Sequence, residues 1–276
     1  MSKGFFILCG PPGGGKSFEA AHAFPQSLYI KSSPNVLQFY EQWLVSPPGI
    51  ASGLALPATT VTVDVFSINE AAPQVDTAGN LIRIPQYQTL TGMLVALVQE
   101  CTINRGQNLG PSYGGVPIRN VVIDEGSTFW QRIFSEIKPL CFANSGNPDT
   151  RKAFGETAEW SVMITDQLRL LPTLGVNVCF VTHDQEPEIA AGKKGGPKVV
   201  SQGIMRTMTA DADGVLLRVL ERPPPEAALG TKPMRKWRAH SSPDWITKLR
   251  GVSDEQFEMM ADMNLSQILA LAGYAA

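Results

Sequence analysis

Short runs of consecutive apolar residues alternate along the chain with longer segments that have helical spacing. The apolar runs cover residues 4–9, 27–31, 60–66, 120–124 and 176–182. Runs of this length are typical of strands that are buried on both faces of a sheet. Helical spacing occurs in segments 18–24, 36–44, 90–101 and 155–171. This alternation predicts an α/β protein whose central, mostly parallel sheet is flanked by helices.

The pattern changes in the last third of the chain. Three shorter runs, 214–220, 234–240 and 245–250, predict antiparallel strands at the C-terminal edge of the sheet. Ser253 and Gln256 fit a capping box that would open a helical tail. We therefore expect one core over residues 1–251 and a helical tail over 252–276, with residues 69–88 as a surface excursion.

Composition narrows the class of protein. The chain has 276 residues, 43% of them hydrophobic and 17% charged, which is typical of a globular fold and not of a disordered chain. A net charge of −2 excludes a uniformly basic coat for nucleic acid. The apolar runs are too short to cross a membrane, and the four scattered cysteines indicate neither a disulfide framework nor a zinc site. These features predict a cytoplasmic protein with no membrane partner.

The strongest motif follows the first apolar run. Residues 10–17 read Gly-Pro-Pro-Gly-Gly-Gly-Lys-Ser and match the pattern G-x-x-x-x-G-K-[ST] without a mismatch. Glycines allow backbone N–H groups to converge on phosphate oxygens, and the following helix adds its positive N-terminal dipole. A glycine-rich turn with an exposed lysine is the alternative, but the strand before and the helix after favour an ATP site. The expected nucleotide contacts are Gly10, Pro11, Pro12, Gly13, Gly14, Gly15, Lys16, Ser17 and Phe18.

A second motif, formed by two acidic residues, lies at the end of the run 120–124. In that motif Asp124 would hold Mg²⁺ together with the Ser17 hydroxyl, and Glu125 would activate the attacking water. A buried strand that simply ends in two solvated acids has the same pattern. Two other acids, Asp64 and Glu70, compete with Glu125 for the catalytic role, because they lie near the end of another predicted strand.

The run 176–182 ends in Thr182 and His183, where a side chain could sense the γ-phosphate; an ordinary strand-end histidine fits His183 equally well. The loop 184–203 that follows contains Lys193, Lys194 and Lys198 among glycines. Such a loop could contact a phosphate backbone without reading its sequence. A solvated loop has the same composition, and the residues alone slightly favour that interpretation.

Two cations occur near the end of the core. In the predicted strand 245–250, Lys248 and Arg250 would share one face because side chains alternate along a strand. They could reach the γ-phosphate in a neighbouring subunit and act as an arginine finger does. An exposed basic edge strand, which protects a sheet against aggregation, is the alternative.

Together these residues resemble a RecA-like P-loop ATPase, and more closely the phage-encoded RecA-like ATPases of single-strand annealing and recombination. The matching features are 10–17, the strand ending at Asp124, the strand ending at 182–183, the segment 210–215 and Trp245-x-x-Lys248-x-Arg250. The resemblance implies an Mg²⁺-dependent ATPase that forms a ring or filament and acts on single-stranded DNA in phage recombination or replication. It also implies DNA contact by the loop 184–203 and a role for Lys248 and Arg250 across the subunit interface.

Two other functions fit the same residues. One is a P-loop motor that serves a protein or virion assembly without DNA affinity, which the acidic balance and the pair of Asp124 and Glu125 favour modestly. The other is a nucleotide-regulated structural protein that hardly hydrolyses ATP. A small-molecule kinase fits poorly because no arginine-rich lid is evident.

Overall fold

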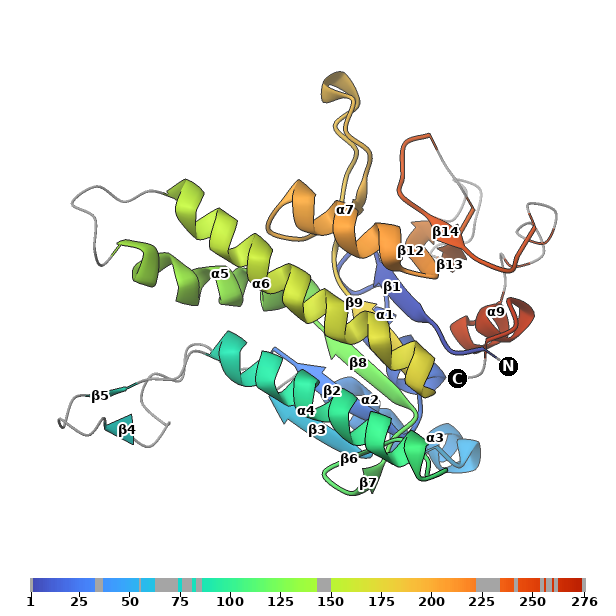
Figure 1. Cartoon of the computed structure of the whole chain (residues 1–276). Coiled ribbons are helices and arrows are strands. Elements are labelled where there is room, and N and C mark those ends of the chain that lie inside the picture. The colour runs from blue at the N-terminus through green and yellow to red at the C-terminus, as the bar shows by residue number, and fades with distance from the viewer. Residues whose placement is uncertain are drawn as a thin grey trace.

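The structure is a computed structural model of the chain. It describes residues 2–32, 37–54, 56–62, 74–75, 81–82, 86–142, 150–221, 234–240, 243–253, 256, 260 and 263–274. The fold is α/β, with helices on both faces of a central sheet (Figure 1).

Eight strands of the described residues form the central sheet, in the order β13-β12-β1-β9-β8-β2-β3, with β14 also paired to β12. Their bounds are β1 Phe5–Cys9, β2 Ser27–Lys31, β3 Thr59–Thr62, β8 Asn120–Asp124, β9 Asn177–Val181, β12 Gly214–Glu221, β13 Met234–Arg238 and β14 Lys248–Leu249. The strands from β12 to β3 are parallel, whereas β13 and β14 run antiparallel to β12. This confirms the expected mostly parallel sheet with antiparallel strands at its C-terminal edge, although β12, the first of the three runs expected there, is parallel to β1.

Helices cover the two faces unequally. One face packs against α4 Gln86–Gly106, α5 Gly126–Phe142, α6 Thr150–Leu170 and α7 Gln202–Asp211. The other packs against α1 Lys16–Ala23, α2 Gln38–Leu44 and α9 Leu265–Leu271, and the short α3 Pro47–Ser52 follows α2. The remaining elements are β4 Gln74–Val75, β5 Leu81–Ile82, β6 Ser112–Tyr113, β7 Val116–Pro117, β10 Asp184–Gln185, β11 Gly196–Pro197 and the 3-10 turns η1 Leu171–Leu174 and η2 Ile189–Ala191.

Several predicted elements differ from those observed. Helix α5 was not predicted, although Phe129, Trp130 and Ile133 give it a buried face, because a glycine begins it and Pro139 interrupts it. Helix α4 begins at Gln86, inside the expected excursion, and β4 and β5 also lie there. The strand expected over 60–66 is β3, which ends at Thr62, and residues 63–66 lie outside the described residues.

The last two predicted segments also changed. Of the strand expected over 245–250, only Lys248–Leu249 pairs as β14, and Trp245 instead bridges Gly195. In the expected capping box the Ser253 N–H donates to Gln256 Oε1 at 2.9 Å, but the helix expected there falls largely outside the described residues. The described helix of the tail is α9, which has its own capping box and packs on α1 in the same chain.

Candidate nucleotide-binding site

The conformation of the loop between β1 and α1 requires glycine at two positions. A Cβ on Gly10 would lie 2.6 Å from the Arg218 carbonyl oxygen, so only glycine lets the backbone pass β12 there. Gly15 has a φ of 81°, which favours glycine, and as the N-cap of α1 it provides no side-chain cap. The first amides of α1 therefore face the loop without a capping side chain, and they form a site suited to an anion.

Lys16 lies beneath this loop. The residue is 7% exposed, and its Nζ donates to the carbonyl oxygens of Gly10 and Pro11, both at 2.8 Å. Burial lowers the pKa of Lys16, although Asp184 and Asp124 act in the opposite direction. Neutral carbonyls are weak partners for a buried ammonium, and a phosphate would form stronger, charge-assisted hydrogen bonds with it.

The two expected metal ligands lie in direct contact. The Ser17 hydroxyl donates to Asp124 Oδ1 at 3.1 Å, and the Tyr29 hydroxyl donates to Asp124 Oδ2 at 2.5 Å. Burial raises the pKa of Asp124 to about 6, against the hydrogen bonds from Tyr29, the Glu125 N–H and Ser17. A cation beside this carboxylate would favour its ionised form.

The residues present fit Mg²⁺. A hydroxyl and a carboxylate are the hard oxygen ligands that this ion takes, and it usually keeps water and substrate phosphates as its other ligands. Among the residues described, no group of three or more His, Cys, Asp or Glu side chains could hold a metal by itself. Ser17 and Asp124 would thus hold Mg²⁺ together with a nucleotide.

Glu125 follows in a strained conformation. Its φ is 57°, a left-handed value that costs a residue with a side chain about 1–2 kcal/mol. Its N–H donates to Asp124 Oδ1 at 2.8 Å, and its carbonyl accepts from the Phe129 N–H as α5 begins. The left-handed conformation of Glu125 turns the chain at the end of β8, and the residue lines the cavity in front of the loop.

Strand β9 lies between β1 and β8, so Thr182 and His183 lie between the loop and Asp124. Burial, together with the charges of Lys16 and Lys198, lowers the pKa of His183. Its Nδ1 is buried and has no hydrogen-bond partner within the described part of the chain. The lowered pKa favours a neutral imidazole, and His183 lines the cavity in front of the loop.

A chain of hydrogen bonds leads from this point to the next loop. The His183 N–H donates to Ser127 Oγ at 3.0 Å, and the Ser127 and Thr182 hydroxyls lie 2.8 Å apart. The Thr182 hydroxyl donates to the Lys198 carbonyl at 2.9 Å. The chain connects α5, the end of β9 and the base of the hairpin that follows β9.

These residues surround one cavity of about 600 Å³, a size common for ligand sites. Its lining is Gly13, Gly14, Gly15, Lys16, Ser17, Phe18, Phe39, Tyr40, Asp124, Glu125, Val181, Thr182, His183 and Arg235. Of the predicted nucleotide contacts, Gly10, Pro11 and Pro12 are not among the lining residues. Sequence reasoning missed Phe39, Tyr40, Val181 and Arg235.

The predicted pair of Lys248 and Arg250 lies at the end of the sheet opposite the cavity, where the parallel strands β1 and β12 begin. Lys248 Nζ donates to the Ala210 carbonyl at 3.1 Å, and Arg250 pairs with Asp213 at 2.9 Å. Asp213 in turn bonds the backbone of Phe5, where β1 begins, whereas the phosphate loop follows the end of β1. About 13 Å of strand separates the two ends, so within one chain the pair does not reach the cavity. Only Lys248 lies in a strand, so the shared strand face that the sequence predicted is not formed.

The lysines of the loop after β9 lie on a hairpin that projects beyond the sheet (gold in Figure 1). Lys193 pairs with Glu188 at 2.8 Å, and Lys198 lies at the base beside His183. Over residues 184–198 the three lysines, which include Lys194, are balanced by three acids, Asp184, Glu186 and Glu188. The hairpin therefore has no net charge, and Ile189 is an exposed large apolar side chain near its tip.

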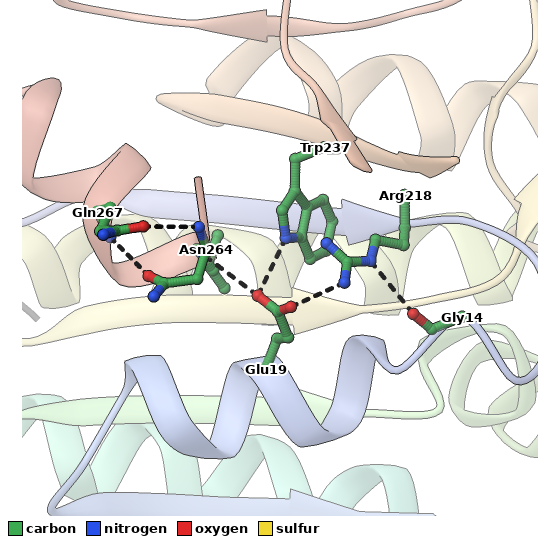
Figure 2. Close-up of polar contacts among 7 residues, drawn as sticks. Gly14, Glu19, Arg218, Trp237, Asn264 and Gln267 are labelled. Carbon is green, nitrogen blue, oxygen red and sulfur yellow. Dashed lines mark hydrogen bonds and ion pairs between the residues drawn. The ribbon is translucent and has the colours of Figure 1, made fainter. Parts of the chain in front are cut away.

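Glu19 on α1 connects the loop to the C-terminal part of the fold (Figure 2). Its carboxylate pairs with Arg218 at 2.8 Å and accepts from Trp237 Nε1 and from the Leu265 N–H, both at 3.1 Å. Arg218 Nε also donates to the Gly14 carbonyl at 3.2 Å, and the guanidinium lies 4.8 Å from the centre of the Trp237 ring. One carboxylate thus joins α1, β12, β13 and the start of α9.

We expect Glu19→Ala to lower the free energy of unfolding by about 3 kcal/mol, because removing one partner of a buried ion pair leaves the Arg218 charge uncompensated. Urea denaturation followed by circular dichroism measures this change. The matched control is Glu41→Ala, which removes an exposed glutamate from α2. A change no larger than that of the control would contradict a stabilising role for Glu19.

Comparison with protein-family models finds no match to this sequence, and comparison with curated proteins also finds none. Among solved structures, a KaiC-like protein from the hyperthermophilic archaeon Pyrococcus horikoshii is similar at 12% identity, covering 86% of this chain and 77% of that chain, with a TM-score of 0.38. Among the described residues, no helix has the length and apolar character needed to cross a bilayer.

Proposed function

We propose that the protein is an Mg²⁺-dependent ATP hydrolase of the P-loop type. The observation that carries this proposal is the convergence of Lys16, Glu125 and His183 with the Ser17 and Asp124 pair on one cavity. They come from the ends of three adjacent parallel strands, the place where open α/β sheets bind their ligands.

Each residue would act from its observed position. The amides at the start of α1 and the Lys16 ammonium would bind the phosphates, and Ser17 with Asp124 would hold Mg²⁺. The ion, when bound, would neutralise charge on the phosphates. Glu125 would accept a proton from the attacking water, and the neutral His183 would contact the γ-phosphate.

We further propose that the active form is a homo-oligomer, a ring or a filament, in which Lys248 and Arg250 complete the site of a neighbouring subunit. The distance of this pair from the cavity in its own chain supports action on a neighbour. Three apolar side chains on or next to α2 and α3 are exposed, Phe39, Val45 and Ile50; Phe39 lines the cavity, and together they suit a subunit contact there.

Arg250→Ala is expected to retain ATP binding and to lose turnover by about 100-fold, less than a full arginine-finger loss because Lys248 remains. Steady-state hydrolysis and nucleotide binding are measured in parallel, and Arg250→Lys, which keeps the charge beside Asp213, serves as the control. Mixing Arg250→Ala with Lys16→Ala subunits should restore part of the turnover, since an intact loop then meets an intact Arg250. Unchanged turnover in Arg250→Ala, or no recovery on mixing, would contradict action in trans.

We propose single-stranded DNA as the polymer on which the oligomer acts, in the host cytoplasm during phage recombination or replication. Lys193 and Lys194 near the tip of the projecting hairpin, and the hydrogen bond from Thr182 to the hairpin base, support this partner. The second candidate, a motor for a protein or virion assembly, is favoured by the charge balance of the hairpin and by Ile189, whose side chain is 76% exposed. A hairpin with no net charge and an exposed apolar side chain packs more favourably against a protein surface than against a phosphate backbone.

Steady-state ATP hydrolysis with and without single-stranded DNA, at several protein concentrations and a stated salt concentration, tests the proposal. Stimulation by DNA and a more than linear rise with protein concentration would support the oligomeric DNA-dependent ATPase. The same assay on Lys193→Ala/Lys194→Ala should lose the stimulation and keep the basal rate. Turnover indifferent to DNA would favour the assembly motor, and an absence of turnover would overturn the proposed ATPase.

A further inference from the structure

Arg235 is a cation at the cavity that lies outside the phosphate-binding motif. It is exposed on β13, lines the cavity, and its Nη1 lies 3.4 Å from the position that a Cβ on Gly15 would occupy. Gly15 is the N-cap of α1, so the guanidinium lies beside the amides that face the loop.

The neighbouring cations have carboxylate partners, whereas none of the described carboxylates pairs with Arg235. Lys236 pairs with Glu221 at 2.9 Å, and Arg218 pairs with Glu19 at 2.8 Å. Within the described part of the chain, Arg235 has neither an ion pair nor a side-chain hydrogen bond, and its charge lowers the pKa of the like-charged Arg218. An anion in the cavity would remove this imbalance of charge.

The backbone beneath Arg235 is fixed. Arg235 lies opposite Leu220 in the pairing of β12 with β13, and Trp237, two residues along on the same face, is held by Glu19. Side chains that are two residues apart in a strand point to the same side. Arg235 is thus presented to the loop by a strand that the Glu19 contacts already hold in place.

We propose that Arg235 binds the nucleotide within its own subunit, at the phosphates that ATP and ADP have in common. The order of the strands in the sheet indicates which phosphates Arg235 would contact. Strand β13 lies on one side of β1, whereas Asp124, Glu125 and His183 follow β8 and β9 on the other side, where the γ-phosphate would lie. Arg235 therefore faces the phosphates nearer the nucleoside. This inference rests on the proposed ATP site.

Fluorescently labelled ADP and a labelled, non-hydrolysable ATP analogue, titrated into the full chain with Mg²⁺, test the assignment. We expect Arg235→Ala to weaken both nucleotides about tenfold and equally, the loss of one charge-assisted contact. Arg235→Lys should lie between wild type and Arg235→Ala. The matched control is Lys236→Ala, which removes the adjacent cation on the opposite face and should leave both affinities unchanged. In turnover, KM should rise about tenfold while kcat is retained.

Three results separate the outcomes. If the wild type binds nucleotide and Arg235→Ala binds it equally well, this inference is wrong and the proposed ATP site stands. Weakening of the ATP analogue alone would place Arg235 at the γ-phosphate and overturn the assignment. If the wild type binds neither nucleotide, the proposed function fails first. Thermal melting of each variant, expected to match the wild type because Arg235 is exposed, excludes unfolding as the cause.

Discussion

Lys16→Ala is expected to reduce the kcat/KM for ATP about 1000-fold. The Lys16 ammonium is buried beneath the loop, and its hydrogen-bond partners among the described residues are the neutral carbonyls of Gly10 and Pro11, whereas a nucleotide phosphate would form stronger, charge-assisted bonds with it. Removing a cation that neutralises a transferring phosphoryl group costs about 100- to 1000-fold, and weaker ground-state binding adds to this loss.

Steady-state hydrolysis and nucleotide titration measure the effect of Lys16→Ala. The matched control is Lys152→Ala, which removes an exposed lysine from α6. Because Lys16 donates to carbonyls of its own loop, thermal melting accompanies both variants. A Lys16→Ala protein that is folded and hydrolyses ATP at the rate of the control would remove the basis of the proposed function.

Glu125→Gln is expected to lower kcat about 1000-fold and to leave ATP affinity close to that of the wild type. Glutamine retains the shape of glutamate but cannot accept the proton of the attacking water, and general-base catalysis contributes about 100- to 10,000-fold. The backbone N–H that bonds Asp124 is unchanged by the substitution. Binding and turnover should therefore separate in this variant.

Single-turnover hydrolysis and titration with labelled nucleotide measure the two quantities for Glu125→Gln. Glu159→Gln, an exposed position on α6, is the control. If Glu125→Gln retains turnover, the catalytic acid is another residue. The sequence offers Asp64 and Glu70, both of which lie outside the described residues, and the same substitution at each would then identify it.

Most of what the sequence predicted depends on contiguous residues. Strand β2 was predicted with its observed bounds, and β1, β8 and β9 within about one residue, because buried strands of a parallel sheet consist of uninterrupted apolar runs. The phosphate loop and the acid that ends β8 meet because parallel strands bring their carboxyl ends to one edge. Asp124 therefore reaches Ser17 across 107 residues of sequence.

The parts that were missed depend on contacts between distant segments. Arg218 and Glu19 are separated by 199 residues, and no local pattern distinguishes that arginine from any other residue of a buried strand. Arg235 reaches Gly15 only because β13 turns back along β12. The prediction for Lys248 and Arg250 assumed a six-residue strand, but the packing of Trp245 against Gly195 takes the first part of that segment out of the sheet.

The hydroxyl groups of Ser127 and Thr182 have one proton each, and this fixes the direction of every hydrogen bond in their chain. Thr182 gives its proton to the Lys198 carbonyl, so it must accept from Ser127, which in turn accepts from the His183 N–H. No proton is left over and no hydroxyl could reverse its role without breaking a neighbouring bond. A shift at the end of β9 that broke one bond would leave an unpaired donor or acceptor at each side of the break. The hydrogen bonds of these two hydroxyls thus link the base of the hairpin to the residues after β9 that line the cavity, so a movement of either that breaks a bond leaves polar groups unpaired.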